Sequence, residues 1–484
     1  MTTQSKKQSI ISSLFWKLME RGGTQGIQFV VQIILARILV PKDYGIIALI
    51  AIFITISNVF VQSGLNTALI QKKDADEVDF SSVFYLSLAI AGMLYVVLFF
   101  AAPLIAAFYG IFQLVPVLRV LSIILFFGAF NSIQNAVVAK KMQFKKLFFS
   151  SLGAMLSSGI VGIVLAYSGA GVWALVIQQL TNQFMITVIL WFTVKWRPKL
   201  VFSFQKVKVL FLYGWKLLVS SLIDNLYGNL RSLIIGKIYN PTMLGYYNRG
   251  DQFPNIVVTN INGSIQSVML PVLSANQDDK NKVRGMVRRS IVTSSFILFP
   301  MMMGLAVCAE PLVKILLTDK WLPCVPFLQL MCINYAFWPI HTANLQAINA
   351  LGRSDIFLKL EIIKKSIGII ILCLSIPFGI YIMAATQSLV SLIASIINSY
   401  PNRNLLGYGY KEQIIDVMPS MILSIIMGVV IYTIRFRNLS VWLTLIIQIV
   451  FGIIIYVTLA YLFKLECFNY LLNTIREIKN RKNK

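Results

Sequence analysis

Two apolar helices of the chain each carry a row of polar residues along one face. Their spacings of three and four residues bring the side chains to one side of a helix. Guanidinium groups fit phosphate oxygens, and amides both donate to and accept from hydroxyls. The rows therefore indicate a cavity for a large, anionic, hydroxyl-rich ligand. Their members are Lys17, Arg21, Gln25, Gln28 and Gln32 in the first row, and Lys216, Ser220, Asp224, Gly228 and Arg231 in the second.

Further amides follow in other apolar helices, and we expect them to line one shared cavity with the two rows. They are Asn58, Gln62 and Asn66; Asn131, Gln134 and Asn135; Asn255, Thr259, Asn262 and Gln266; and His341, Asn344, Gln346 and Asn349. Charges at the bilayer centre cost about 2.5–3.5 kcal/mol on insertion scales, so Arg21, Lys216, Asp224 and Arg231 should face the interior. The alternative is structural: Asp224 pairs with Lys216 or Arg231, and the amides only join helices.

His341 is the only histidine of the chain and lies inside an expected span. It is a candidate for ion coupling, together with Asp224 and Glu20. A lone membrane histidine more often bridges helices by hydrogen bonds than carries protons. One histidine and five scattered cysteines do not form a usual zinc site, so we expect no metal and regard the cysteines as packing residues.

The elements that position these residues are membrane-spanning helices. The chain is 57% hydrophobic and 13% charged, with a mean hydropathy of +0.77, and apolar runs of about 20 residues repeat along it. We expect an all-α polytopic membrane protein with about fourteen spans, twelve to fourteen being compatible with the pattern. The expected spans are about 13–39, 44–69, 81–109, 114–139, 148–167, 171–194, 209–238, 248–273, 290–317, 325–351, 357–377, 378–400, 414–434 and 441–463.

The basic residues predict the orientation of these spans. Most of the 43 Lys and Arg residues fall in alternate loops and in the C-terminal tail. Since cytoplasmic loops retain positive charge, both termini should be cytoplasmic. The net charge of +25 then reflects topology and attraction to anionic lipid, and we expect no nucleic-acid partner.

The chain contains an internal repeat. The ten residues Ala36 to Gly45 (ARILVPKDYG) recur as Gly236 to Gly245 (GKIYNPTMLG), each time between two apolar helices. Such repeats in an apolar chain are typical of transporters. The orientation predicted from the basic residues places both copies on the extracytoplasmic side. Arg37 and Lys237 should then lie at the outer rim of the protein and not in a binding site. Weaker matches follow in the same order, from Pro116 to Pro326 and from Gly171 and Gln179 to Gly379 and Gln387.

No loop is long enough for a soluble catalytic or nucleotide-binding domain, and no phosphate-binding glycine motif is present. We expect no cofactor, so that energy must come from an H⁺ or Na⁺ gradient, the membrane potential or the gradient of the substrate. The basic N-terminus lacks a short apolar region with a cleavage site, which argues against a cleaved signal peptide.

Three segments resemble the Wzx-type polysaccharide exporters, near the colanic-acid and teichuronic-acid branch. They are ARILVPKDYG, IIGKIYNPTMLGYYNRGDQFP from Ile234, and NALGRSD from Asn349. These exporters belong to the superfamily of the multidrug exporters and the lipid II flippase. The resemblance implies two pseudo-symmetric six-helix lobes, at 1–200 and 201–405, two further helices at 406–465 and a basic tail at 466–484.

The resemblance also implies a function. The chain would move an undecaprenyl-pyrophosphate-linked oligosaccharide from the cytoplasmic to the periplasmic leaflet of the bacterial cytoplasmic membrane by alternating access, for lipopolysaccharide, exopolysaccharide or capsule. Independently of the resemblance, we expect a monomer. Its partners would be this lipid-linked oligosaccharide, the bilayer, and the polymerase and glycosyltransferases of the pathway. Alternatives are a drug or metabolite cation antiporter with a carboxylate-dominated pocket, a membrane glycan polymerase or ligase, which would need a sizeable extracytoplasmic loop, and a passive scramblase.

Overall fold

The computed structural model describes residues 3–62, 64–72, 74–433, 440–470, 472, 473 and 477. For residues 3–15, 17, 18, 21 and 213 it describes the helical backbone and not the side chain. The described residues form helices and loops only, as the sequence predicts. They divide into two compact units, Met1–Gly245 and Tyr246–Lys484.

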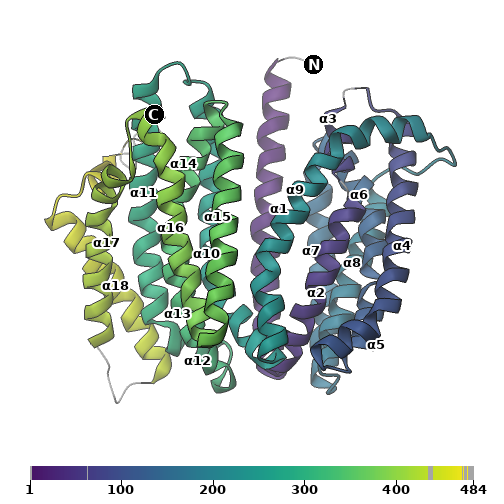
Figure 1. The fold of residues 1–484 in the computed structure, drawn as a ribbon, viewed down its shortest axis with the longest axis horizontal. Coiled ribbons are helices and arrows are strands. Elements are labelled where there is room, and N and C mark those ends of the chain that lie inside the picture. The colour runs from purple at the N-terminus through teal and green to yellow at the C-terminus, as the bar shows by residue number, and fades with distance from the viewer. Residues whose placement is uncertain are drawn as a thin grey trace. The chain divides into compact units, whose positions relative to one another are not determined.

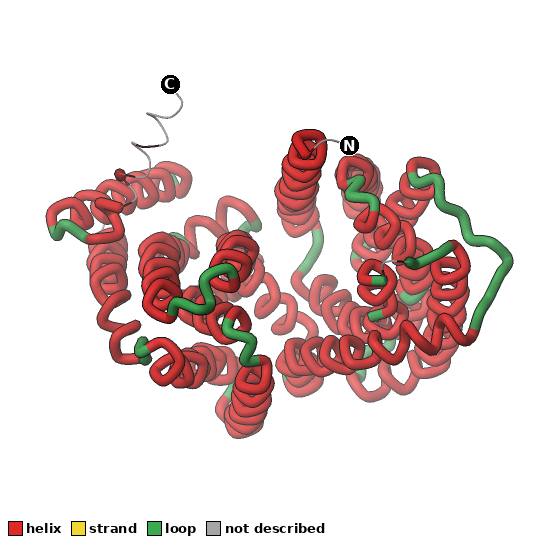
Figure 2. The backbone as a smooth tube through the Cα atoms, turned by 90° about the horizontal axis from the view of Figure 1, so that it is seen from above, coloured by secondary structure: helices red, strands yellow, loops and turns green. Residues whose placement is uncertain are grey.

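Unit 1 is a bundle in which the helices run side by side (Figures 1 and 2). Its helices are α1 (Thr3–Ile38), α2 (Pro41–Gln62), α3 (Leu65–Gln71), α4 (Glu77–Tyr109), α5 (Leu114–Leu121), α6 (Ile124–Lys140), α7 (Phe144–Tyr167), α8 (Val172–Thr193) and α9 (Phe204–Ile238), followed by the first residues of α10 (Pro241–Ser274).

Unit 2 contains the rest of α10 and a second helical bundle (Figure 1). It comprises α11 (Lys280–Val307), α12 (Ala309–Leu316), a 3₁₀ helix (Asp319–Cys324), α13 (Val325–Ala336), α14 (Trp338–Ala350), α15 (Ser354–Ser375), a second 3₁₀ helix (Ile376–Phe378), α16 (Ile380–Leu406), α17 (Tyr410–Thr433) and α18 (Val441–Leu462).

Ten stretches of the described residues are long and apolar enough to cross a membrane. Two of them join consecutive helices, α2 with α3 and α5 with α6. The chain is therefore a polytopic helical membrane protein, as predicted. The ten are Pro41–Gln71, Glu77–Tyr109, Leu114–Lys140, Phe144–Tyr167, Val172–Thr193, Pro241–Ser274, Lys280–Val307, Ile380–Leu406, Tyr410–Thr433 and Val441–Leu462.

Four of the fourteen expected spans are not among these ten. The spans expected at 13–39, 209–238 and 357–377 are covered by the helices α1, α9 and α15, which carry charged residues along their length. The span expected at 325–351 is divided into α13 and α14 at Phe337. Pro339 is the second residue of α14, a position that tolerates proline because the N–H groups of the first helical turn have no helical partner.

Small residues let the helices of unit 1 approach one another. A β-carbon on Gly159 of α7 would lie 2.7 Å from a methyl group of Val31 in α1. A β-carbon on Gly162 would lie 2.7 Å from the side chain of Gln178 in α8. In a bilayer, where lipid is as apolar as the helices, such close packing is a main source of association.

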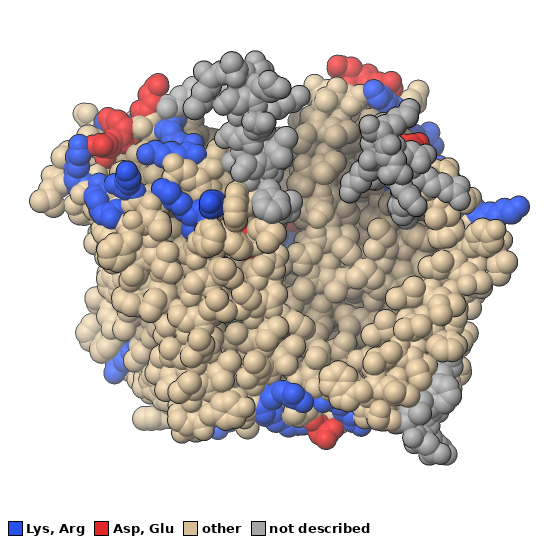
Figure 3. Space-filling view, turned by 180° about the vertical axis from the view of Figure 1, so that it is seen from behind, with Lys and Arg blue, Asp and Glu red and all other residues tan. Residues whose placement is uncertain are grey.

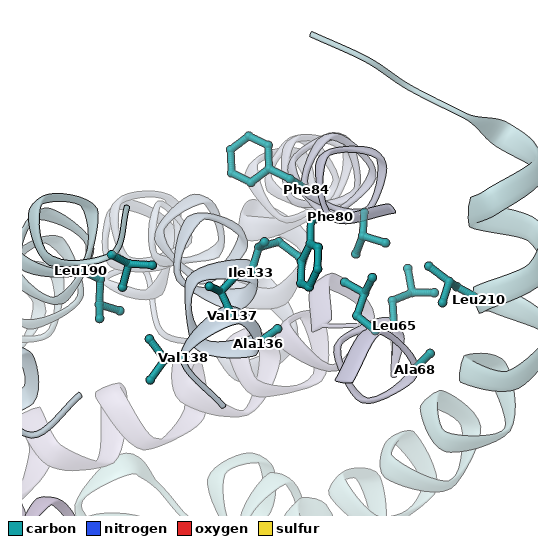
Figure 4. Close-up of a cluster of buried hydrophobic side chains, with 13 residues drawn as sticks. Leu65, Ala68, Phe80, Phe84, Ile133, Ala136, Val137, Val138, Leu190 and Leu210 are labelled. Atoms are coloured by element: carbon teal, nitrogen blue, oxygen red, sulfur yellow. The ribbon is translucent and has the colours of Figure 1, made fainter. Parts of the chain in front are cut away.

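A buried apolar cluster joins five helices of unit 1 (Figure 4). Leu210 of α9 belongs to this cluster and is 4% exposed, so α9 packs within unit 1. The other labelled members are Leu65 and Ala68 of α3, Phe80 and Phe84 of α4, Ile133, Ala136, Val137 and Val138 of α6, and Leu190 of α8.

The internal repeats of the sequence occur at equivalent points of the helices. Pro41 and Pro241 are the first residues of α2 and α10. Gly171 and Gly379 directly precede α8 and α16, with φ of 55° and 97°. Such positive φ angles favour glycine, which explains why this residue type is present in both copies.

Many of the charged side chains lie near the helix ends. On the face drawn in Figure 3, Lys, Arg, Asp and Glu lie at the upper and lower ends, and a band of other residues covers the middle. This is the distribution that a bilayer requires, because charged groups remain in water while the apolar band contacts lipid.

Candidate functional site

Unit 1 contains a polar cavity of about 430 Å³. Six amides, two serines and one carboxylate line it, beside four apolar or glycine positions. The lining residues are Glu20, Asn58, Gln62, Asn66, Ile124, Gly128, Asn131, Ser132, Asn135, Leu147, Ser151, Gln183 and Ile186. The cavity thus presents mainly neutral groups that donate and accept hydrogen bonds.

The helical repeat positions these amides. Asn58 and Gln62 lie one turn apart on α2, and Asn66 follows on α3, while Asn131 and Asn135 lie one turn apart on α6. Gly128 of α6 faces Asn58, since a β-carbon there would be 2.8 Å from its Oδ1. Glycine at this position therefore leaves the space that the Asn58 amide occupies.

Several side-chain oxygens of the residues that line the cavity have no hydrogen-bond partner among the described residues. Asn66 donates through Nδ2 to Ser132 Oγ at 2.6 Å, and Asn131 donates to Gln183 Oε1 at 3.4 Å. The side-chain oxygens of Asn58, Asn66 and Asn131 are buried and have no hydrogen-bond partner among the described residues. Buried acceptors without partners cost free energy, and a ligand with hydroxyl groups would satisfy them.

The cavity brings together six of the residues that the sequence singles out, namely Glu20, Asn58, Gln62, Asn66, Asn131 and Asn135. Gln25 and Gln32 are half-buried and Gln28 is exposed on α1, and none of the three lines this cavity. The backbone of Arg21 lies in α1, but its side chain is outside the described residues. Sequence analysis missed Ser151 of α7 and Gln183 of α8, although Gln179 and Thr187 lie one helical turn from Gln183 and are a local signal that could have found it.

The second polar row lies on α9, which packs against α2, α3 and α4. Lys216 and Asp224 are exposed, and Arg231 is half-buried. None of these three residues lines the polar cavity of unit 1. Their assignment to a substrate site stays a prediction.

In unit 2, α10 carries a second polar group. Asn262 is 3% exposed, and neither atom of its amide has a partner among the described residues. Asn255 donates to Asp251 Oδ2 at 3.3 Å, and the Tyr335 hydroxyl donates to Asp251 Oδ1 at 2.9 Å. Sequence analysis missed Asp251, although its position one helical turn before Asn255 is a local signal that could have found it.

His341 on α14 takes part in a chain of hydrogen bonds with α16. Asn398 Nδ2 donates to His341 Nδ1 at 3.1 Å, and His341 Nε2 lies 3.2 Å from Ser391 Oγ. The Ser391 hydroxyl donates in turn to the carbonyl of Asn334 at 2.9 Å. These roles are all met by a neutral imidazole with its proton on Nε2, an arrangement that suits a bridge between helices.

A buried amide network joins α14, α16 and α17. Asn344 donates to Gln413 Oε1 at 2.7 Å, and Gln413 donates back to Asn344 Oδ1 at 2.9 Å. Asn402 also donates to Asn344 Oδ1, at 2.6 Å. Because all three side chains are fully buried, this network fixes the three helices and is not open to a ligand.

Ion pairs connect the end of α3 and the start of α4 with the first turn of α9. Lys72 binds the buried carboxylate of Asp79 at 2.7 Å, and Lys206 binds Asp76. The Lys206 ammonium and the backbone N–H of Asp79 lower the pKa of Asp76 to about 2. The same bond from Asp76 raises the pKa of Lys206. These groups lie at the ends of helices and hold the connection in place.

Within the part of the chain that the structure describes, no group of three or more His, Cys, Asp or Glu side chains could hold a metal ion.

A model of the polysaccharide biosynthesis protein family matches residues 34–326, more than half of the chain. The chain belongs to this family. The family consists of Wzx-type membrane transporters and not of enzymes, so the resemblance that the sequence predicts is confirmed.

Curated relatives of this polysaccharide biosynthesis protein cover most of its length. Teichuronic acid biosynthesis protein TuaB of Bacillus subtilis (strain 168) is 26% identical over 399 residues, which are 79% of this chain and 80% of that protein. Lipopolysaccharide biosynthesis protein WzxC of Escherichia coli (strain K12) is 22% identical over 441 residues, 88% and 89% of the two chains. Succinoglycan biosynthesis transport protein ExoT of Rhizobium meliloti (strain 1021) is 24% identical, covering 69% and 68%.

Solved structures show which fold this family member has. The lipid II flippase MurJ, in an inward closed conformation, matches with a TM-score of 0.74 over 93% of this chain and 98% of that one, at 16% identity. An inward-facing multidrug transporter of the MATE family matches with a TM-score of 0.62 over 79% and 94%, at 14% identity. The chain therefore has the helical fold that these transporters share.

Proposed function

We propose that this transporter moves an undecaprenyl-pyrophosphate-linked oligosaccharide from the cytoplasmic to the outer leaflet of the bacterial cytoplasmic membrane by alternating access. The product would enter lipopolysaccharide, exopolysaccharide or capsule synthesis. The observation that carries the proposal is the cavity of unit 1, in which six amides and two serines surround a single carboxylate. Neutral groups that both donate and accept suit sugar hydroxyls, whereas an organic cation favours carboxylates.

The proposed architecture has fourteen spans in two six-helix lobes, 1–200 and 201–405, followed by two helices at 406–465 and the basic tail. It is supported by the equivalent helix starts at Pro41 and Pro241 and at Gly171 and Gly379. The cytoplasmic position of both termini rests on the distribution of Lys and Arg between loops.

Three cations would attract the pyrophosphate, namely Arg21, Lys216 and Arg231. Amides would hold the glycan, and Asp224, Glu20 or His341 would couple transport to an ion gradient. Glu20 has the support of lying in the polar cavity, while the hydrogen bonds of His341 favour a structural part. The proposed amides are Gln25, Gln28, Gln32, Asn58, Gln62, Asn255 and Asn262.

Reconstitution of the full chain in vesicles tests this proposal. Translocation of a defined undecaprenyl-pyrophosphate oligosaccharide is measured with and without H⁺ and Na⁺ gradients. We expect Arg21→Ala to lose most translocation and Arg21→Lys to retain part of it, because a point charge replaces a bidentate fork. Arg37→Ala on the same helix is the matched control, since Arg37 is expected at the rim and should leave translocation unchanged.

Equal translocation by wild type, Arg21→Lys and Arg21→Ala would contradict the phosphate role. Flux of organic cations without movement of the oligosaccharide would favour a drug antiporter, and elongation of the glycan without translocation would favour a polymerase.

A further inference from the structure

Two cavities of unit 2 meet at Thr293 on α11. The first has a volume of about 470 Å³ and lies between α11 and the segment that follows α18. The second is a groove of about 640 Å³ between α10 and α11. Thr293 lines both of them, and neither contains a residue that the proposed function uses.

One wall of the first cavity is fixed by ion pairs, in which two carboxylates neutralise Arg288. Arg288 donates through Nε and Nη2 to the two carboxylate oxygens of Asp416 at 2.9 and 3.0 Å, and through Nη2 to Glu466 at 3.2 Å. The Tyr408 hydroxyl donates to the same Asp416 at 2.7 Å. These bonds join α11, α17 and the segment after α18, and they hold the cavity open in one geometry.

Arg289 supplies a positive charge that forms no ion pair among the described residues. Its guanidinium lies 4.8 Å from the centre of the Tyr470 ring, and no carboxylate among the described residues is within ion-pair distance of it. Asn469, Asn473 and Thr293 add neutral donors to the same cavity. At Gly285 a β-carbon would meet nothing within 4 Å, so the cavity has free space at this point.

The second cavity is apolar along most of its length. Ile261, Ile265 and Val268 of α10 line one side, and Ile297 of α11 lines the other. The lining of α10 runs from Asn260 to Met269, which corresponds to about 13 Å at 1.5 Å per residue. A groove of this length and composition fits part of a hydrocarbon chain.

We propose that the joined cavities are a binding site for a lipid whose phosphate headgroup has a net negative charge. The phosphate lies against Arg289 and the amides of the first cavity, and one chain follows the groove between α10 and α11 past Thr293. A guanidinium without a carboxylate partner, next to an apolar groove at the end of the membrane-spanning helices, is the complement of an anionic headgroup with its chain. The site is separate from the proposed path of the oligosaccharide.

Native mass spectrometry of the full chain in detergent tests the site. The probes are phosphatidylglycerol, phosphatidylethanolamine with the same acyl chains, and undecaprenyl phosphate. Wild type should bind phosphatidylglycerol about fivefold more tightly than phosphatidylethanolamine, which is the factor that about 1 kcal/mol per basic residue gives. Arg289→Gln should remove this preference. Arg284→Gln on the same helix keeps it, because Arg284 does not line either cavity.

A second variant, Gly285→Phe, fills the first cavity and should weaken binding of all three lipids. Comparing phosphatidylglycerol with undecaprenyl phosphate identifies the lipid that the site prefers. Tighter binding of phosphatidylglycerol indicates a bulk phospholipid, and tighter binding of undecaprenyl phosphate indicates a carrier lipid. Equal binding of phosphatidylglycerol and phosphatidylethanolamine by wild type, or equal losses in Arg289→Gln and Arg284→Gln, would overturn the site. A failure of oligosaccharide translocation leaves this binding measurement unaffected.

Discussion

Gly45 packs so closely on Pro241 that a β-carbon on Gly45 would lie 1.7 Å from the Pro241 carbonyl oxygen. The reverse contact is equally close, since a β-carbon on Gly245 would lie 2.1 Å from the carbonyl oxygen of Pro41. The two copies of the repeated corner therefore contact each other through the same pair of positions. Glycine is required at both because a backbone carbonyl cannot rotate away as a side chain can.

Gly45→Ala should destabilise the protein by about 1–3 kcal/mol, the usual cost of overpacking, because the added methyl group forces α2 and α10 apart. Gly245→Ala should act in the same direction. The measurement is the thermal unfolding of each purified variant in detergent.

Gly228→Ala is the matched control for these two variants. A β-carbon at Gly228, inside α9, would meet nothing within 4 Å, so the higher helix propensity of alanine should leave stability unchanged or raise it. Equal unfolding temperatures for Gly45→Ala and wild type would contradict the close contact with Pro241.

His341→Leu and Asn398→Leu should each lower stability by about 1–3 kcal/mol, since each leaves a buried partner without its hydrogen bond. The double variant should lose less than the sum of the two single losses, because both remove the same bond. Unfolding of the four proteins in detergent gives this cycle. If His341 is a bridge, His341→Gln should also keep the pH dependence of translocation, and a shifted pH profile would instead make it a coupling residue.

Asn135→Phe should block the polar cavity of unit 1 with little effect on folding. Asn135 is exposed and lines the cavity, so the larger side chain occupies space that we assign to sugar. We expect translocation to fall at least tenfold while the unfolding temperature stays within a few degrees of wild type. Thr193→Phe is a control at an exposed position of α8 outside the cavity. Full activity of Asn135→Phe would remove this cavity from the substrate path.

Asp76→Asn should change how stability depends on pH. The pKa of Asp76 is about 2 in the folded protein, against about 3.9 for an unperturbed aspartate. The ionised form is therefore favoured by folding, and its contribution is complete above about pH 4 and is lost as the pH falls towards 2. Unfolding temperatures should differ between wild type and Asp76→Asn at pH 5 and converge near pH 2.

Asp74→Asn, a change at a nearby exposed aspartate, is the control and should follow wild type at every pH. If the unfolding temperatures of wild type and Asp76→Asn differ by the same amount from pH 6 to pH 2, the ion pair between Asp76 and Lys206 does not contribute to the pH dependence of stability.

The sequence by itself determined the class of fold and part of the polar cavity. The lengths of the apolar runs specify membrane helices, because an apolar segment of that length has no other stable place. Asn58 and Gln62 were found since residues one helical turn apart share a face wherever the helix lies. The repeated corner was visible because proline and glycine recur at the same spacing, and the first residue of a helix is a position that suits proline.

Only the tertiary structure decided which of these faces meet. Gln183 joins Asn131, Tyr335 binds Asp251, and Arg288 binds Asp416 and Glu466 across 52 to 178 residues of sequence. Such pairs follow from how helices pack, and each helix alone offers several polar faces of similar appearance. Gly45 belongs to this second level, because it lies inside α2 without a positive φ and its residue type is required by the contact with Pro241, which exists only in the folded chain.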